Sequence, residues 1–275
     1  MLKIIQITDC HLMPEGERLF TLDPADRLSR AVADINENHA DASLCVLTGD
    51  IANSGQAAAY ALLRDILAGL RVPFRLLLGN HDDRDELRQA FPKIEVDANG
   101  FLQSNQSTSA GFLLLLDTVE AGVHSGVYCA QRCEWLETAL DAAAGRPVYL
   151  FMHHPPMDIG MPRLDQYRIL ENEAFARTVQ RFPNIRHIFF GHVHRPIAGS
   201  WLGIPVSSIP STNHQNALDL SEGRANIVRL EPPVYGVILI DADSTIVHHC
   251  DFASEVKRFR YDPDAAQYAQ VEQIG

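Results

Sequence analysis

The segment IIQITDCHL (residues 4–12) is an apolar run that ends in a carboxylate, a thiol and an imidazole. The run predicts a buried strand from Leu2 to Thr8. Because residues two apart in a strand point the same way, we expect Asp9 and His11 on one face and Cys10 on the other. A buried carboxylate needs a partner that offsets its desolvation, so the pair suggests a metal site. Taken alone, the pair is also typical of a capped strand end.

Length and composition predict one large α/β domain. The chain has 275 residues, 46% of them hydrophobic, enough to bury one large core. We expect a catalytic domain over residues 1–252 and a polar C-terminal tail or interface arm over residues 253–275. No apolar run reaches the roughly 18 to 20 residues of a membrane span, and no signal peptide is recognisable. Five scattered cysteines fit a reducing compartment, so we expect a cytoplasmic protein.

The charge balance limits the partners. A formal net charge of -12 argues against a nucleic-acid polymer, because binding along a phosphate backbone needs a basic stripe. An anionic substrate would instead have to meet a local positive charge. The sequence leaves open whether the chain forms a homo-oligomer, as a dimer or a larger assembly.

Apolar runs alternate with segments of helical period, which predicts layered α/β architecture. Asp23 and Pro24 predict a helix start, because the carboxylate can cap the helix and proline suits its first turn. The final third has strand patterns without helices between them, which predicts a separate, meandering second sheet. The other expected helices are 57–70, 131–144 and 171–182, and the expected strands after the first are 43–50, 74–82, 111–118, 147–156, 186–194, 203–210, 234–241 and 244–250.

Five of these apolar runs end in side chains that bind metals. Ligand crevices of open α/β sheets lie outside the carboxyl ends of the strands, so the five endings can converge on one site. Glycines stand just before three of the endings and would allow sharp turns and close backbone approach. The side chains are Asp9 with His11, Asp50 after Gly49, Asn80 with His81 after Gly79, His153 with His154, and His192 with His194 after Gly191.

The mixture of carboxylates, imidazoles and one amide suits divalent zinc, manganese, cobalt or iron. Magnesium and calcium prefer shells made only of oxygen. Seven ligands are too many for one tetrahedral ion, but suit two ions about 3.5 to 4 Å apart that share a bridging carboxylate. We therefore expect two divalent transition-metal ions as cofactors.

These motifs carry a family resemblance. Their order and spacing resemble the calcineurin-like metallophosphoesterase superfamily, and within it the class III cyclic nucleotide phosphodiesterases and their glycerophosphodiesterase relatives. The resemblance implies a four-layer αββα sandwich with two mixed sheets flanked by helices. It also implies a ligand assignment, with Asp9, His11 and His194 on the first metal, Asn80, His153 and His192 on the second, and Asp50 bridging.

The family also implies hydrolysis of a small phosphodiester, a 3',5'-cyclic nucleotide or a glycerophosphodiester. His81 follows a ligand and is expected to assist the leaving group, with second-shell support of the metal as the alternative. His214 resembles a histidine that lines the phosphate pocket, and Asp50 is counted with the catalytic residues. Asn80 and Phe20 complete the expected substrate contacts. A phosphomonoesterase with the same metal core, or a non-catalytic scaffold of this fold, are the competing hypotheses.

Three long loops, 13–21, 157–167 and 211–233, are expected to form the rim or a lid of the site. The first and last loops contribute Leu19, Phe20, Leu218 and Ile227, which suit an organic ester arm, and only Arg18, Arg224 and Arg229 as cations. A monoester dianion would gain from extra cations, so this rim favours diesters.

Overall fold

The first sheet grows outward from the strand that opens the chain. In the computed structural model, which describes residues 1–222, 227–253, 258–262 and 267–271, its order is β13-β12-β1-β2-β3. β1, β2 and β3 run parallel, whereas β12 is antiparallel to β1 and β13 to β12. The strands are β1 (Leu2–Ile7), β2 (Leu44–Thr48), β3 (Phe74–Leu77), β12 (Val234–Ile240) and β13 (Thr245–Asp251).

The second sheet has six strands in the order β4-β5-β6-β7-β9-β8. Its central four strands are parallel, and β4 and β8 pair antiparallel at the edges. The strands are β4 (Ser104–Thr108), β5 (Gly111–Leu115), β6 (Val148–Phe151), β7 (Ile185–Phe190), β8 (Ile197–Trp201) and β9 (Ile204–Ser208).

The prediction of a separate meandering sheet in the final third is wrong. β9 pairs with β7 in the second sheet, and β12 and β13 extend the first sheet beyond β1. Without these partners β1 and β7 would be edge strands with unpaired backbone groups, and pairing along them satisfies those groups. The helix-free final third therefore completes both sheets.

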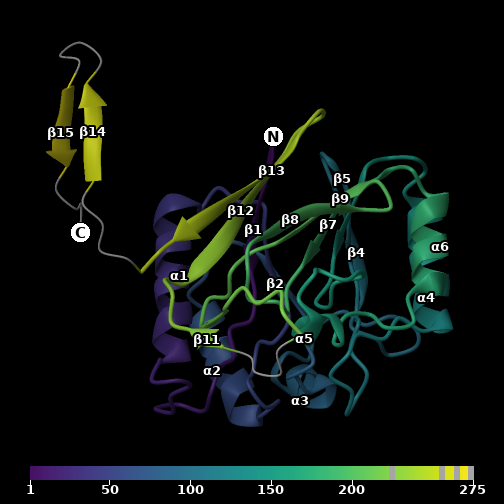
Figure 1. Cartoon of the computed structure of the whole chain (residues 1–275), viewed down its shortest axis with the longest axis horizontal. Helices are drawn as coiled ribbons and strands as arrows, with labels where there is room; N and C mark the ends of the chain where they lie inside the picture. Colours follow the sequence, from purple (N-terminus) through teal and green to yellow (C-terminus); the bar gives the residue numbers. More distant parts are fainter. Residues whose placement is uncertain (223–226, 254–257, 263–266, 272–275) are drawn as a thin grey trace.

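Helices cover the outer face of each sheet (Figure 1), with α1 and α2 on one side and α4 and α6 on the other. The side chain of Asp23 accepts from the backbone N–H of Ala25 and Asp26, and Pro24 occupies the first turn, as predicted. The helices are α1 (Pro24–Asn38), α2 (Ala57–Leu67), α3 (Arg84–Ala90), α4 (Ala130–Ala142), α5 (Pro162–Asp165) and α6 (Glu173–Arg181).

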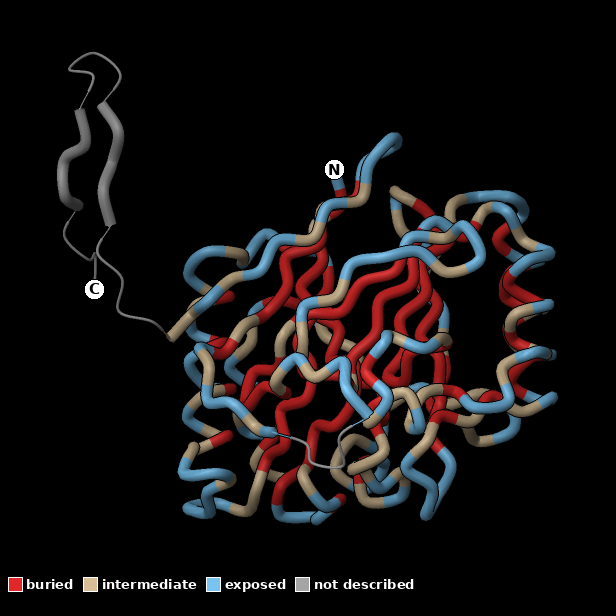
Figure 2. Tube along the Cα trace, viewed as in Figure 1, coloured by how far each residue is buried: buried red, intermediate tan, exposed pale blue. Residues whose placement is uncertain are grey.

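Three apolar layers hold this arrangement together. One lies between the first sheet and α1, α2 and α3, one between the two sheets, and one between the second sheet and α4 and α6. The inner strands are accordingly buried along most of their length (Figure 2), whereas the edge strands β4, β8 and β13 are partly or fully exposed. Continuous apolar runs are typical of strands covered on both faces. The predicted αββα sandwich with two mixed sheets is confirmed.

Shorter pairings complete the chain. β10 (Gln215–Asn216) and β11 (Val228–Arg229) form a two-stranded ladder, as do β14 (Arg258–Asp262) and β15 (Gln267–Val271). In Figure 1 the β14–β15 hairpin lies apart from the two-sheet body. The predicted tail therefore contains a hairpin, and its function as a tail or an interface arm stays a prediction.

Candidate metal centre

Asp9 and His11 lie in the turn after β1, and not within the strand as was expected from the sequence. β1 ends at Ile7, and both residues adopt left-handed backbone angles, with φ of 53° and 47°. Their backbone N–H groups donate to the carbonyls of Gly49 and Asp50, at 3.1 and 2.9 Å. Strand alternation therefore does not explain the positions of these side chains. Asp9 and His11 nevertheless lie together, and Cys10 points into the apolar core, as predicted.

The same left-handed turn recurs at other predicted ligands. Asp50, His192 and His194 have φ of 48°, 69° and 49°. Such angles strain residues other than glycine and occur mostly where the surrounding structure enforces a functional geometry. Five of the seven predicted ligands share this conformation, which turns their side chains into one crevice at the strand ends.

The first cluster consists of Asp9, His11 and His194. The Nε2 atoms of the two imidazoles lie 3.1 Å apart, and His194 Nε2 lies 3.4 Å from Asp9 Oδ1. Ligand atoms about 2.1 Å from a shared tetrahedral ion are separated by about 3.4 Å. The three side chains are almost completely buried and therefore hold ligand atoms at the spacing that one ion requires.

The second cluster consists of Asn80, His153 and His192. His153 Nε2 lies 3.3 Å from Asn80 Oδ1 and 3.2 Å from His192 Nδ1. The other ring nitrogen of His192, Nε2, is buried and has no hydrogen-bond partner among the described residues. These atoms again have the spacing of ligands around one ion.

Asp50 connects the two clusters. Its Oδ2 lies 3.4 Å from His153 Nε2 and 3.7 Å from His11 Nε2, while its Oδ1 accepts from the backbone N–H of His81 at 2.9 Å. One oxygen therefore faces both clusters and the other is held by the backbone. This is the geometry expected of a bridging carboxylate.

Hydrogen bonds on the far side of three imidazoles fix their orientation. His11 Nδ1 lies 3.2 Å from Asn53 Oδ1, His153 Nδ1 lies 2.8 Å from the Thr48 carbonyl, and His194 Nδ1 lies 2.8 Å from the His214 carbonyl. A proton on Nδ1 donates to these oxygens and leaves the lone pair of Nε2 facing the cluster. Such outer bonds set both the tautomer and the angle of metal-binding histidines.

The electrostatics of the clusters favour cations. Burial raises the pKa of the Asp9 carboxyl, but His194 and His153 outweigh it and bring this pKa to about 2. Burial lowers the pKa of His11 and of His192 to about 3. Burial would lower the pKa of His153 too, but Asp50 outweighs it and raises this pKa to about 9. Ionised carboxylates beside imidazoles, two of which have lowered pKa values, form a donor set that suits divalent metal ions.

Glycine is required where these turns approach one another. A Cβ on Gly79 would lie 2.2 Å from Asp50 Oδ1, and a Cβ on Gly49 would lie 2.5 Å from His153 Nδ1. Gly49 also has a φ of 91°, which other residues rarely adopt. Any side chain at these two positions would displace the carboxylate of Asp50 or the imidazole of His153.

Asp82 and Asn53 hold the loops around His81. Asp82 accepts from the backbone N–H of Gly79 at 2.9 Å and of Ala52 at 2.9 Å, and from the Tyr60 hydroxyl. Asp82 therefore joins the loops after β2 and β3 by hydrogen bonds. His81 itself is held through Nδ1, which lies 2.8 Å from the Asn53 carbonyl, so its Nε2 is left for the pocket.

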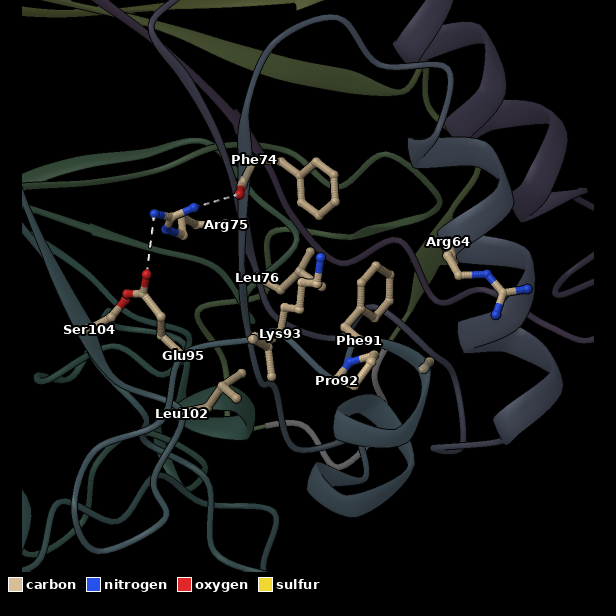
Figure 3. A pocket seen from close by; sticks show the side chains of 12 residues that line it. Arg64, Phe74, Arg75, Leu76, Phe91, Pro92, Lys93, Glu95, Leu102 and Ser104 are labelled. Atoms are coloured by element: carbon tan, nitrogen blue, oxygen red, sulfur yellow. Dashed lines mark hydrogen bonds and ion pairs between the residues drawn. The ribbon is translucent and has the colours of Figure 1, made fainter.

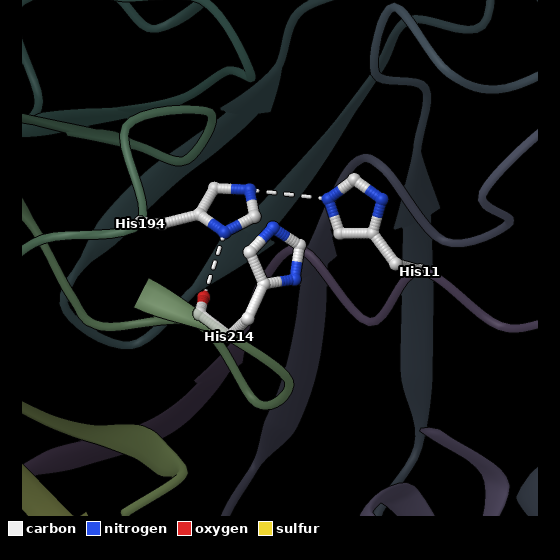
Figure 4. A group of neighbouring side chains, drawn as sticks. All are labelled: His11, His194 and His214. Carbon is white, nitrogen blue, oxygen red and sulfur yellow. Dashed lines mark hydrogen bonds between the residues drawn. The ribbon is translucent and has the colours of Figure 1, made fainter. Parts of the chain in front are cut away.

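His214 lies directly beside the first cluster (Figure 4). The centroid of its ring lies 4.5 Å from that of His194 and 4.9 Å from that of Phe20. Burial, with His194, lowers the pKa of His214 to about 2, and its Nδ1 has no partner among the described residues. The residue thus supplies both a neutral ring at the pocket and the carbonyl that orients His194.

Both clusters open into a cavity of about 500 Å³. His81, His214 and Phe20 line it, and all three predicted rim loops contribute to its wall. Of the rim residues predicted, Leu19 and Phe20 do line the cavity, whereas Leu218 and Ile227 are exposed and do not. The chain turns these two away, and Val228 takes their place.

The three predicted rim cations have other partners or are not described. Arg18 donates to the Thr21 carbonyl, Arg229 pairs with Glu231, and Arg224 lies outside the described residues.

Sequence reasoning missed three residues of this wall: His124, Arg163 and Tyr167. His124 comes from an irregular loop, and Arg163 and Tyr167 come from α5 and the turn after it; none belongs to a metal-ligand motif. The prediction of loop 157–167 as rim includes Arg163 and Tyr167 but not His124. Asn80 Nδ2 lies 3.4 Å from His124 Nδ1. The pocket therefore has an arginine that the rim argument did not consider.

His154, next to a predicted ligand, has a different role. Its Nδ1 lies 2.8 Å from Thr118 Oγ1, and its Nε2 lies 3.2 Å from the carbonyl of His124. Both ring nitrogens are thus engaged outside the clusters, so His154 supports the loops and is not placed as a ligand.

A second cavity, of about 380 Å³, lies beside the edge strand β3 (Figure 3). Phe74, Leu76, Phe91 and Leu102 line it, with Arg75 paired to Glu95 at its margin. None of the seven predicted ligands lines it. The larger of the two cavities, at the strand ends, is therefore the one with metal-binding chemistry.

Comparison with known proteins places the chain in a family. The model of the calcineurin-like phosphoesterases matches residues 2–196, which include both clusters. The chain belongs to the calcineurin-like phosphoesterase family. The family named from the sequence motifs is thereby confirmed.

Curated relatives of this phosphoesterase carry two kinds of name. It is 41% identical over 255 residues to a protein named "probable cyclic nucleotide phosphodiesterase" of Rhodopseudomonas palustris, covering 91% of this chain and 93% of that one. It is 31% identical to a 3',5'-cyclic adenosine monophosphate phosphodiesterase of Vibrio vulnificus, covering 77% and 76%. It is 30% identical to a protein of Arcobacter nitrofigilis named "probable glycerophosphodiester phosphodiesterase", covering 84% and 85%.

Solved structures support the fold. A dimetal phosphatase from Danio rerio superposes with a TM-score of 0.65 at 14% identity, covering 92% of this chain and 96% of that one. Among the described residues, no helix of this phosphoesterase combines the length and the apolar composition that crossing a bilayer requires.

Proposed function

We propose that this phosphoesterase is a binuclear metal-dependent phosphodiesterase of small diesters, 3',5'-cyclic nucleotides or glycerophosphodiesters. The position of Asp50 Oδ2 between two ligand clusters carries the proposal, because a shared carboxylate is the arrangement that holds two ions together. The names of the relatives support the choice of diesters.

In this proposal Asp9, His11 and His194 hold one ion, Asn80, His153 and His192 hold the other, and Asp50 bridges. When bound, two such ions polarise a phosphoryl group and lower the pKa of water. Manganese, iron, zinc and cobalt all suit the donors. The ligand distances within each cluster support this division.

Two histidines then serve the substrate. His81, held through Nδ1 by the Asn53 carbonyl, presents Nε2 to the cavity and is placed to give a proton to the departing alkoxide. His214 and Asn80 contact the phosphoryl group from opposite clusters. Phe20, 48% exposed and packed edge-on against His214, offers an apolar surface to one ester arm.

The test compares bis(4-nitrophenyl) phosphate with 4-nitrophenyl phosphate, using protein loaded with one metal at one pH. The apolar side chains of Leu19, Phe20 and Val228 line the cavity and favour the second ester arm of the diester. We therefore expect a higher kcat/KM for the diester than for the monoester. A clear preference for the monoester would support a phosphatase instead. No metal-dependent turnover of either ester would support the scaffold hypothesis.

Further features of the chain remain proposals of the same kind. We propose a reducing, cytoplasmic location, which the five free cysteines support. We also keep residues 1–252 as the catalytic domain and residues 253–275 as a tail or interface arm, with a homo-oligomer open to test by light scattering. The acidic net charge argues against nucleic-acid polymers as substrates.

A further inference from the structure

The two ends of the active-site cavity differ in chemistry. Phe20 and His214 adjoin the first cluster. The second cluster adjoins three other residues, His124, Arg163 and Tyr167, which we call the α5 wall. The ring centroid of Tyr167 lies 6.4 Å from that of His192, which belongs to the second cluster, and 6.4 Å from that of His124. One end therefore presents a phenyl ring and an imidazole, and the other combines a phenol ring with the donors of a guanidinium.

Arg163 is the unsatisfied member of this wall. Its guanidinium carbon lies 5.6 Å from the centroid of Tyr167, and its Nε is buried without a partner. Among the described residues it makes no side-chain hydrogen bond or ion pair. Arg168, five residues later, by contrast donates to Asp158 at 2.5 Å and to the Ile169 carbonyl at 2.7 Å. The terminal amino groups of Arg163 have no described partner either, so their N–H donors are available for a ligand in the cavity.

The wall is fixed before any ligand arrives. Asp165 accepts from the backbone N–H of Ile159 at 2.7 Å, and Arg168 ties the end of this loop to Asp158. Leu164, next to Arg163, is buried in the core of the second sheet. A preformed wall loses little conformational entropy on binding, which is typical of recognition sites.

The position of Arg163 determines which part of a substrate it reaches. Its described ring contact is with Tyr167, and no described hydrogen bond or ion pair joins it to the seven proposed ligands. A phosphoryl group at the metals would meet the ligands, His81 and His214. Arg163 lines the cavity next to Tyr167, whose ring can support an organic arm of the substrate.

We propose that the α5 wall binds the purine base of a nucleoside 3',5'-cyclic monophosphate and that Arg163 selects guanine over adenine. A purine can stack on the Tyr167 ring. The fork of guanidinium donors matches the acceptors O6 and N7 of guanine, whereas adenine presents an amino donor in place of O6. This inference rests on the proposed diesterase function and names its substrate class.

The test measures kcat and KM for cyclic GMP, cyclic AMP and bis(4-nitrophenyl) phosphate with manganese-loaded enzyme. Arg163→Met should lower kcat/KM for cyclic GMP about tenfold or more, mainly through KM, and change cyclic AMP less than about threefold. Arg163→Lys keeps the charge but not the fork, so it should also lose the preference. Arg177→Met, an exposed position on α6, is the matched control and should change nothing.

A second variant and a binding measurement keep the result independent of turnover. Tyr167→Leu should weaken both nucleotides, and calorimetry with the hydrolysis-resistant phosphorothioate analogue of cyclic GMP should show the same losses. Three results would each overturn the inference. The first is an equal loss of kcat/KM for both nucleotides in Arg163→Met, and the second is a wild-type preference for cyclic GMP in Arg163→Lys. The third is cleavage of the aryl diester but of neither nucleotide. Absence of all diesterase activity in the wild type would instead overturn the proposed function.

Discussion

The two ligand clusters contain similar residues but differ in charge and burial. The first has its own carboxylate, Asp9, and all three of its side chains are buried. The second has the neutral amide of Asn80 in the corresponding place, and Asn80 and His192 are only partly buried. Since Asp50 serves both clusters, the first has two carboxylates and the second has one.

The outer hydrogen bonds differ in the same direction. His11 and His194 are both oriented through Nδ1, whereas His192 Nε2 has no partner among the described residues. A buried, doubly charged cluster with oriented rings favours tight retention of an ion. A partly buried cluster with a single carboxylate favours exchange of its ion. The comparison predicts a tightly held ion at the first cluster and a more weakly held one at the second.

Breaking the shared ligand should have the largest effect. Asp50→Asn keeps a residue that tolerates left-handed φ but removes the charge that both clusters use. We expect turnover to fall on the order of 10³-fold and metal content to fall from two ions to one or fewer. Metal analysis and steady-state kinetics check this, with Asp83→Asn as control because asparagine retains the helix cap. Wild-type turnover in Asp50→Asn would contradict the bridge.

Removing His81 should leave both clusters intact. His81→Ala is expected to lower kcat about 10²-fold, with two ions still bound, because His81 serves the leaving group and not an ion. The loss should be smaller for aryl esters, whose leaving groups need little protonation. His248→Ala, exposed on β13, is the control. If His81→Ala loses an ion, the residue belongs to the ligand set.

Chelation should separate the two clusters. During dialysis against increasing chelator we expect one ion to leave at lower concentration than the other. Asn80→Asp adds the missing carboxylate and should raise the chelator concentration for the first loss about tenfold, while Asn80→Ala should lower it. Metal content by mass spectrometry is the measurement. Loss of both ions in one step, unchanged by either substitution, would remove the distinction.

A buried histidine outside the clusters offers the smallest effect. Burial lowers the pKa of His187 to about 4, and its Nε2 contacts Ser207 Oγ. The unfolded chain takes up a proton first, near pH 6.5, so stability falls as the pH decreases from there to about 4. Between pH 7 and 5 the free energy of unfolding should fall about 2 kcal/mol more in the wild type than in His187→Gln. Denaturant titrations at both pH values check this, and parallel losses would show that His187 does not titrate in this range.

Local patterns in the sequence were sufficient for most elements and for bringing the seven predicted ligands to strand ends. Apolar runs that end in Asp, Asn or His locate the strand ends, since buried strands and metal ligands each have a strong residue signature. They were insufficient where a pairing partner is distant, as for β9 and β12, because strand periodicity does not specify which edge a strand joins. The ends of the helices also differ from the predicted ends by a few residues, because packing against the rest of the molecule decides where a helix stops. The second helix, for example, ends at Leu67 and not at residue 70.

The sequence by itself determined the layered α/β class and the family, and it placed the seven predicted ligands at strand ends, because composition, period and motif order are properties of the chain. Only the tertiary structure decided how those side chains meet. Five left-handed backbone positions, and not strand alternation, aim them into one crevice. It also decided that Asn53 and the His214 carbonyl orient ligand rings, and that an unpaired Arg163 faces the cavity. These contacts join residues as much as 42 positions apart or come from loops without periodicity, so no local pattern encodes them.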